Sequence, residues 1–304
     1  MIISVVVVSY NSQTTIHETL NSILNQSYDL SKIEIIFADD FSTDRTRDII
    51  YKWIEIHSDA FHSVILSFLT ENRGVAINCN KAWRLCTGAW IKSIAADDVL
   101  HMDCIKNNID YAISNDCSVL FSKMQIMKNG ILTNSVLPNK YDIEVLCSNF
   151  DNQLKSLYES NISGAPTTFI NRQALIQIGF VDERYAMLED YPLWIKFLQN
   201  GVKLDFVDNV TVYYRVDDSI SRSKKNIVNL KYFNDLMKFE EEVVFPKLKK
   251  RKLVRIRKQL WYRLMFFIIK LAKNRRNKLV DLIYPVILLI KPAIIKTIIK
   301  KVEL

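Results

Sequence analysis

Short apolar runs alternate with amphipathic stretches through the first hundred residues. The predicted strands are residues 2–9, 33–38, 64–69 and 90–95, and the predicted helices are residues 14–26, 45–57 and 78–86. The strands are continuous and rich in Val and Ile, as strands covered on both faces are. Strand–helix alternation at this spacing favours a parallel sheet with right-handed crossovers. The first half of the chain is therefore predicted to have an α/β fold with helices on both faces of the sheet.

The pattern is weaker in the second half of the chain. A predicted helix at 103–115 and strand at 118–123 precede residues 124–165, which are polar and irregular and predict an inserted or mobile loop. Further predicted strands are 167–170, 203–207 and 210–214, and further predicted helices are 172–178 and 191–199. From about residue 228 the pattern is helical. We therefore expect a domain of residues 1–222, with halves 1–115 and 116–222, and a helical region of residues 223–304.

Charge divides the chain differently from hydropathy. Residues 1–244 hold 23 Lys and Arg against 31 Asp and Glu, whereas residues 245–304 hold 18 Lys and Arg against two acidic residues. A basic tail on an acidic body is typical of a segment that meets a polyanion, either a membrane or a nucleic acid. The six glycines form neither GxGxxG nor GxxxxGK, which disfavours a glycine-rich dinucleotide fold and a P-loop NTPase.

The cysteines and the apolar segments give predictions about the cellular compartment and about membrane insertion. The five cysteines include no CxxC pair, which indicates reduced thiols rather than a disulfide framework. Residues 2–9 lack a basic flank and a cleavage site, so they are predicted to be a buried strand and not a signal peptide. The apolar groups of the tail are interrupted well before the roughly 20 residues of a membrane span, so no transmembrane anchor is expected.

Acidic and polar residues follow three of the predicted parallel strands. Ser9-Tyr10-Asn11 ends the first strand, Asp39 and Asp40 end the second, and Asp97-Asp98 follows the fourth. Ligands of open α/β sheets bind outside the carboxyl ends of the strands. Carboxylates gathered there suit a hard divalent cation, sugar hydroxyls or a nucleobase N–H. Taken singly, each of these groups could instead be a helix cap or an ordinary turn, with no ligand.

These motifs resemble the family 2 glycosyltransferases with the GT-A fold. The resemblance rests on residues 4–11 (SVVVVSYN), residues 37–46 (FADDFSTDRT), Asn72-Arg73-Gly74, Ala96-Asp97-Asp98 and residues 189–194 (EDYPLW), and it covers about residues 1–222. It implies a Rossmann-like, mostly parallel sheet. It also implies an inverting enzyme that uses a nucleotide-diphospho-sugar, usually UDP-linked, with Mn²⁺ or Mg²⁺.

The resemblance also implies a role for each motif residue. Asp40, with Asp39 beside it, would accept from the uracil N–H, and Tyr10 would stack near the base. Ser9 and Asn11 would belong to the same nucleotide-sugar site, and Arg73 would lie by the uracil or the phosphates. Asp97 and Asp98 would be the acidic pair at the metal, with Asp97 toward the ribose or the donor sugar and Asp98 on the ion. Asp190 would be the catalytic base, with Glu189 beside it.

The chemistry suits these residue types. A leaving diphosphate needs a neutralising cation where no glycine cradle exists, and Mg²⁺ and Mn²⁺ take oxygen ligands. Inversion needs a carboxylate that removes the proton of the attacking hydroxyl. Asp190 precedes a predicted helix, whose free amides favour an ionised carboxylate, and simple N-capping is the alternative.

The last strands depart from the family pattern. The family often has Arg-x-His here, with the His near the metal, whereas this chain has Arg215 and then Asp217. Either Asp217 replaces the His as a metal ligand, or the metal lacks a third protein ligand. Arg215 is expected near the diphosphate or in a structural ion pair. His101 is expected to start a helix rather than bind metal. Trp194 is expected in the core, with the floor of an acceptor site as the alternative.

The basic tail interleaves Lys and Arg with large apolar residues over 247–301. This pattern favours an interfacial helix on an anionic membrane surface and disfavours nucleic acid, which is not an expected partner. The alternative is a helical bundle packed on the body or used for oligomerisation. Attachment to the cytoplasmic face of the inner membrane would bring a UDP-sugar to a lipid-linked acceptor.

The specific expectation is transfer of a hexose, glucose or galactose, to GlcNAc or GalNAc on undecaprenyl diphosphate in O-antigen or capsule assembly. Two other functions remain open at this point. One is a soluble glycosyltransferase acting on a protein or free saccharide, with the tail used for oligomerisation. The other is an inactive, membrane-attached module that binds a sugar nucleotide.

Overall fold

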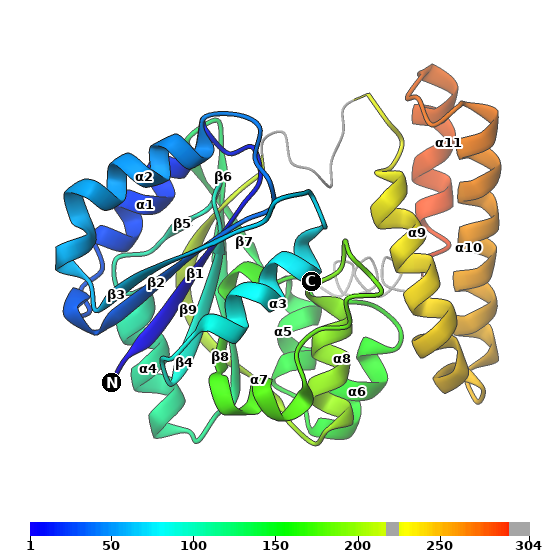
Figure 1. Ribbon diagram of the computed structural model, residues 1–304. Helices are drawn as coiled ribbons and strands as arrows, with labels where there is room; N and C mark the ends of the chain where they lie inside the picture. Colours follow the sequence, from blue (N-terminus) through cyan, green and yellow to red (C-terminus); the bar gives the residue numbers. More distant parts are fainter. Residues whose placement is uncertain (217–224, 292–304) are drawn as a thin grey trace. The chain divides into compact units, whose positions relative to one another are not determined.

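The apolar runs of the first hundred residues form four parallel strands in the computed structural model, which describes residues 1–216 and 225–291 (Figure 1). These strands are β1 (Ile3–Ser9), β2 (Ile33–Asp39), β3 (Ser63–Phe68) and β4 (Trp90–Ala95), in the order β3-β2-β1-β4. Ser9 pairs with Asp39, and Val8 pairs with Ala95. The carboxyl ends of β1, β2 and β4 therefore lie side by side, and each is followed by a predicted polar motif.

The sheet continues beyond β4 with strands of mixed direction. These strands are β8 (Phe169–Asn171), β6 (Val119–Lys128), β9 (Leu204–Arg215) and β5 (Val99–Leu100), with β7 (Ile131–Leu137) paired to β6. β8 runs antiparallel to both β4 and β6, whereas β6 and β9 are parallel. Because β5 follows the Asp97-Asp98 motif directly and pairs with β9, the sheet brings the end of β9 close to that motif.

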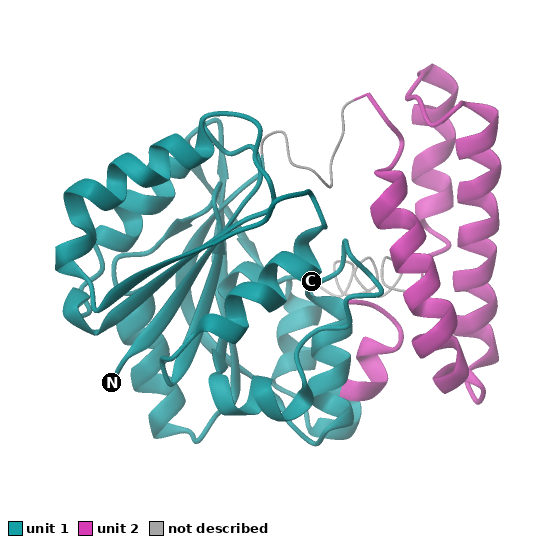
Figure 2. Ribbon diagram, viewed as in Figure 1, with its two compact units in different colours: residues 1–153, 162–216 teal, residues 154–161, 217–304 magenta. Residues whose placement is uncertain are grey.

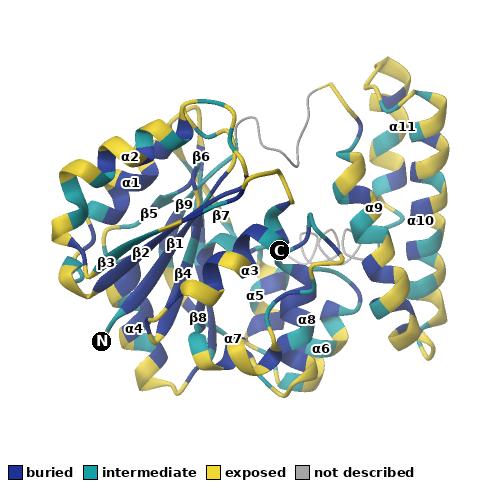
Figure 3. Cartoon of the chain, in the orientation of Figure 1, coloured by how far each residue is buried: buried dark blue, intermediate teal, exposed yellow. Residues whose placement is uncertain are grey.

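Helices cover both faces of the sheet, which confirms the predicted α/β class. The helices of this part are α1 (Ile16–Leu24), α2 (Thr46–His57), α3 (Val75–Leu85), α4 (Cys104–Ser114), α5 (Lys140–Leu146), α6 (Phe150–Leu157), α7 (Arg172–Ile178) and α8 (Tyr191–Gln199). Val5 and Val7 of β1 pack in one core with residues of α1, α2 and α4. On the sheet's other face, Trp194 of α8 contacts Phe121 of β6 edge-to-face, with ring centroids 5.0 Å apart. Figure 3 shows the buried strands between exposed helix faces.

Two expectations about the second half were wrong. Residues 124–165 are not an irregular loop, because β6 runs on to Lys128 and is followed by β7, α5 and α6. Asn129 and Gly130, both with positive φ, make the two-residue turn of a β-hairpin. The two predicted strands 203–207 and 210–214 are one strand, β9. Its pairing with β6 shifts register near Lys123, so the polar residues between the apolar runs do not end the strand.

The chain divides into two compact units (Figure 2). The first contains residues 1–153 and 162–216, and the second contains residues 154–161 and 217–304. Residues 154–161 therefore belong to the second unit, although we placed them in the first domain. The predicted boundary at residue 222 lies outside the described residues.

The second unit is helical, as predicted. Its elements after residue 224 are α9 (Leu230–Phe239), a π-helical turn (Glu240–Val244), a 3-10 turn (Phe245–Leu248), α10 (Lys252–Leu271) and α11 (Lys278–Leu288). Phe233 of α9 packs against Trp261 and Tyr262 of α10. Lys258 and Glu240 form a buried ion pair of 2.7 Å. Over residues 1–216 and 225–291, we find no helix with both the length and the apolar character needed to cross a membrane.

Candidate active site

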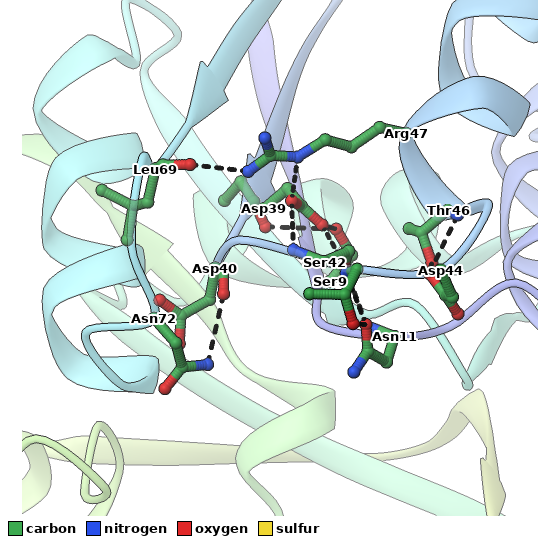
Figure 4. Close-up of polar contacts among 12 residues, drawn as sticks. Ser9, Asn11, Asp39, Asp40, Ser42, Asp44, Thr46, Arg47, Leu69 and Asn72 are labelled. Atoms are coloured by element: carbon green, nitrogen blue, oxygen red, sulfur yellow. Dashed lines mark hydrogen bonds and ion pairs between the residues drawn. The ribbon is translucent and has the colours of Figure 1, made fainter.

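Asp39 is held in a closed network at the carboxyl ends of β1 and β2 (Figure 4). Its carboxylate accepts from Ser9 Oγ at 2.9 Å, from Ser42 N at 2.9 Å and Oγ at 2.5 Å, and from Arg47 Nε. Arg47 also donates to the carbonyl oxygen of Leu69 at 2.6 Å. Donors of this chain thus occupy both oxygens of Asp39, so the geometry gives it the role of fixing the loop after β2.

Asp40 binds a different loop. Its Oδ1 accepts from the backbone N–H of Arg73 at 2.7 Å, and its Oδ2 accepts from that of Gly74 at 2.9 Å. The side chain of Asn72 donates to the Asp40 carbonyl at 3.2 Å, as Figure 4 shows. The nucleobase contact of Asp40 stays a prediction. The side chain of Arg73 is half-exposed and lies 3.7 Å from Glu71.

Tyr10 and Asn11 leave the end of β1 toward solvent. The Tyr10 side chain is exposed, which leaves its ring accessible for stacking. Asn11 has a φ of 52°, in the left-handed region that Asn tolerates. Its side-chain oxygen accepts from Thr43 N at 2.8 Å, and its own N–H donates to Ser42 Oγ at 2.8 Å. Asn11 therefore ties the loop after β1 to the loop after β2.

In the acidic pair that follows β4, Asp98 is buried and Asp97 is half-buried, next to the end of β9. Asp98 is 1 % exposed, and its Oδ1 accepts from the backbone N–H of Arg215 at 2.9 Å. Arg215 Nε donates to the Asp97 carbonyl at 2.8 Å, and its Nη2 pairs with Glu18 at 2.6 Å. Burial raises the pKa of both aspartates, and the neighbouring Asp97 charge raises the pKa of Asp98 further.

These residues fit a hard divalent cation. The charged form of a buried carboxylate pair is disfavoured, and a bound cation would offset that cost. Among the described residues, Asp98 has one hydrogen bond to its carboxylate, which leaves an oxygen for a metal. Asp217, the other predicted ligand, lies outside the described residues. In the described part of the chain no group of three or more His, Cys, Asp or Glu could hold a metal alone. Asp98 and Asp97 would therefore share the ion with substrate oxygens and water.

Glu189 and Asp190 stand at the start of α8. Asp190 is the N-cap residue, and its Oδ1 accepts from Tyr191 N at 2.6 Å. Burial and the adjacent Asp190 raise the pKa of Glu189 from 4.5 to about 8. A carboxyl group with a raised pKa beside a second acid is a common feature of acid–base sites. Asp190 therefore caps α8, and its role as the catalytic base stays a prediction.

The Asp40 loop lies against the loop that leads to α8. A Cβ added to Gly74, whose φ is +90°, would be 2.6 Å from the carbonyl oxygen of Ala186. Ala76 N donates to the same oxygen at 3.0 Å. The Cys79 thiol of α3 is buried, and its pKa is raised by burial and then by the charges of Glu189 and Asp40. Acids from the two halves of this unit therefore flank one helix.

Two further expectations concern the side chains of Trp194 and His101. Trp194 is buried against Phe121 and Phe197, so it is part of the core and does not form an exposed acceptor floor. His101 Nδ1 accepts from Asp103 N at 3.2 Å, and its carbonyl accepts from Cys104 N at the first turn of α4. His101 thus stands at a helix start, as expected.

The structure adds contacts of four residues to which the sequence assigned no role. They are Glu18, Ser42, Arg47 and Gly74, which hold Arg215, Asp39 and the Asp40 loop. Ser42 and Gly74 belong to the quoted motifs, so their positions were usable signals. Glu18 and Arg47 lie on amphipathic helices among other polar residues, and nothing in the local pattern marks them.

Comparison with known proteins agrees with this architecture. The family model "Glycosyl transferase family 2" matches residues 4–179. The Escherichia coli UDP-Glc:α-D-GlcNAc-diphosphoundecaprenol β-1,3-glucosyltransferase WfaP is 31 % identical over 224 residues, which are 73 % of this chain and 81 % of WfaP.

Two solved structures share the fold. The crystal structure of S. aureus TarS 1-349 in complex with UDP-GlcNAc has a TM-score of 0.61 at 21 % identity, over 84 % of this chain and 70 % of that one. The mannosyltransferase PcManGT from Pyrobaculum calidifontis, in complex with GDP-Man and Mn²⁺, has a TM-score of 0.55 at 22 % identity, over 72 % of this chain and 58 % of that one. The acidic motifs at the strand ends, the GT-A-like sheet and the matched family model lead to one conclusion: the chain belongs to glycosyltransferase family 2.

Proposed function

We propose that this glycosyltransferase moves a hexose, glucose or galactose, from a UDP-sugar to GlcNAc or GalNAc linked through diphosphate to undecaprenol. The observation that carries the proposal is the contact between the Asp40 loop and the loop before α8. Gly74 meets Ala186, four residues before Asp190, so a donor at Asp40 and an acceptor at Asp190 would be neighbours. WfaP supports the choice of donor and acceptor, since its name gives UDP-Glc and a GlcNAc-diphosphoundecaprenol.

In the proposed reaction, Asp190 removes the proton from the acceptor hydroxyl as its oxygen attacks the anomeric carbon. The bond from that carbon to the diphosphate breaks, UDP leaves with the electron pair, and the configuration inverts. Glu189, with its pKa of about 8, is mostly protonated at neutral pH and adds little negative charge beside the base. Asp98 and Asp97 would hold Mn²⁺ or Mg²⁺, which neutralises the leaving diphosphate when bound.

The product would be a lipid-linked disaccharide of the kind that O-antigen or capsule assembly uses. Because the acceptor is lipid-linked, we place the enzyme at the cytoplasmic face of the inner membrane as a peripheral protein.

The experiment uses the full chain with a panel of UDP-sugars and short-chain GlcNAc- and GalNAc-diphospholipids, with product analysed by mass spectrometry and NMR. We expect a β-linked product from UDP-glucose or UDP-galactose that requires Mn²⁺ or Mg²⁺ and disappears with EDTA. Transfer to a protein or a free saccharide instead would contradict the acceptor assignment. UDP binding without transfer to any acceptor would indicate an inactive binding module.

Asp190→Asn tests the base with its capping role preserved. Asn caps helices as well as Asp does, so the urea midpoint should stay close to wild type. The rate of transfer should fall by about 10²–10⁴-fold, the range for loss of a general base. Asp190→Ser is a second variant that caps without a carboxylate. Near-normal turnover in either variant would show that the base is another residue.

A further inference from the structure

Helix α10 carries two apolar faces, and the second unit buries only one of them. Trp261, Tyr262, Met265 and Ile268 are each at most 5 % exposed and face the inside of this unit. Another set of α10 residues is between 43 % and 78 % exposed: Leu253, Ile256, Leu260, Phe267 and Leu271. Their spacing of three, four, seven and four residues places them in one stripe along the helix, away from the buried face.

Helix α11 has a similar exposed stripe. Leu279, Leu282 and Val286 recur at intervals of three and four residues and are between 55 % and 73 % exposed. The two helices are held together by the guanidinium of Arg257, which donates to the carbonyls of Ile290 and Leu289 at 3.1 Å. They therefore present two exposed apolar stripes from one compact helical unit, which we call the α10–α11 face.

Basic residues border the stripe of α10. Lys252, Arg263 and Lys270 are exposed and recur at intervals of 11 and seven residues, so they form a row beside the apolar stripe. Helix α10 contains no acidic residue, and Asp281 is the single acidic residue between 251 and 291. Long basic side chains can extend their charges outward while the apolar residues beside them are buried. Apolar stripes bordered by a row of Lys and Arg are the pattern of an interfacial helix, so this face suits a lipid surface with anionic headgroups.

We propose that the α10–α11 face docks on an anionic lipid bilayer. The apolar stripes would enter the boundary between headgroups and acyl chains, and the basic row would lie at the anionic headgroups. This inference deepens the proposed function, because it gives the surface by which an enzyme with a lipid-linked acceptor would reach it.

The test is flotation of the full chain with vesicles of phosphatidylcholine alone or mixed with phosphatidylglycerol, at low and high salt. We expect the protein to float with the mixed vesicles, to float at least tenfold less with phosphatidylcholine, and to be released in part by salt. The double variant Ile256→Glu with Leu260→Glu should lose at least tenfold of the flotation. The matched control is Ile131→Glu with Leu132→Glu on β7, where the side chains are 71 % and 43 % exposed, and it should float like wild type.

A second readout separates this inference from the proposed function. The Ile256→Glu, Leu260→Glu variant should keep its urea midpoint and its transfer to a short-chain acceptor free in solution. Normal transfer together with wild-type protein that does not float would overturn the docking and leave the proposed function standing. Flotation that is equal on both vesicle types, or equal in the double variant and wild type, would also overturn it. If wild type sediments as a dimer without vesicles and the double variant as a monomer, the face binds a second copy and the proposal is wrong.

Discussion

The backbone N–H of Arg215 donates to Asp98 Oδ1 at 2.9 Å and joins the end of β9 to the acidic pair after β4. The two residues are 117 positions apart in the chain. Because the donor is a main-chain group, it satisfies one oxygen of a buried carboxylate whatever side chain stands at 215. The arrangement holds the Asp98 carboxylate in place beside the end of β9.

Asp98→Asn should separate metal-dependent activity from folding. The asparagine oxygen can still accept from Arg215, and the variant places no charge in a site that is almost completely buried. We expect transfer to fall by at least 10²-fold, while the urea midpoint without metal stays equal or rises. Transfer assays over a Mn²⁺ series and urea unfolding check both. A variant that keeps metal-stimulated transfer would show that Asp98 is not a ligand.

Asp39→Asn and Asp40→Asn should have different effects, although the two residues are adjacent. Asp39 accepts from four donors, including the Arg47 guanidinium, so its loss should lower the free energy of unfolding by about 2–3 kcal/mol. Asp40→Asn should instead weaken UDP binding by about tenfold or more, as removal of a charged hydrogen-bond acceptor does. Urea unfolding and calorimetric titration with UDP measure the two effects. Equal losses of stability and UDP affinity in both variants would refute this division of roles.

Gly74→Ala should damage the contact between the two acidic loops. The backbone there has a φ of +90°, and the new Cβ would be 2.6 Å from the Ala186 carbonyl oxygen. We expect a loss of stability of about 1–3 kcal/mol and a lower kcat, because the loop before Asp190 must shift. Gly130→Ala is the matched control, since its φ is +74° and its Cβ would meet nothing within 4 Å. The control should lose only about 1 kcal/mol and keep its kcat; a similar fall in kcat for both would exclude a specific role for the Gly74 contact.

Stability should depend on pH through Glu189. Its pKa is about 8 in the folded chain against 4.5 ordinarily, so between these values the folded state holds a proton that the unfolded state releases. Stability therefore falls as pH rises from about 4.5 to 8. Glu189→Gln should flatten this part of the curve, measured by urea unfolding at several pH values, whereas Glu241→Gln at an exposed position should not. An unchanged slope in Glu189→Gln would assign the dependence to another group.

The hairpin of β6 and β7 shows where local pattern failed. Asn129-Gly130 is a strong turn signal, yet β7 exposes most of its residues and so lacks the alternation that identifies a half-buried strand. The polar stretch inside β9 had the opposite effect and suggested a break. Pairing with β6, through two register shifts, carries the strand across it. In both cases the deciding interactions come from a neighbouring strand rather than from the segment itself.

The sequence alone determined the class of sheet, the polar motif after β1 and the acids after β2 and β4, because strand periodicity and strand ends are local properties of the chain. It also indicated the helical, basic character of the second unit. Only the tertiary structure decided which acids are already bonded within the chain. Asp39 is closed by donors from β1, α2 and its own loop, and Asp98 meets an amide of β9. Such donors come from distant segments, so only the assembled sheet shows that Asp39 accepts from four donors while Asp98 accepts from the backbone of β9.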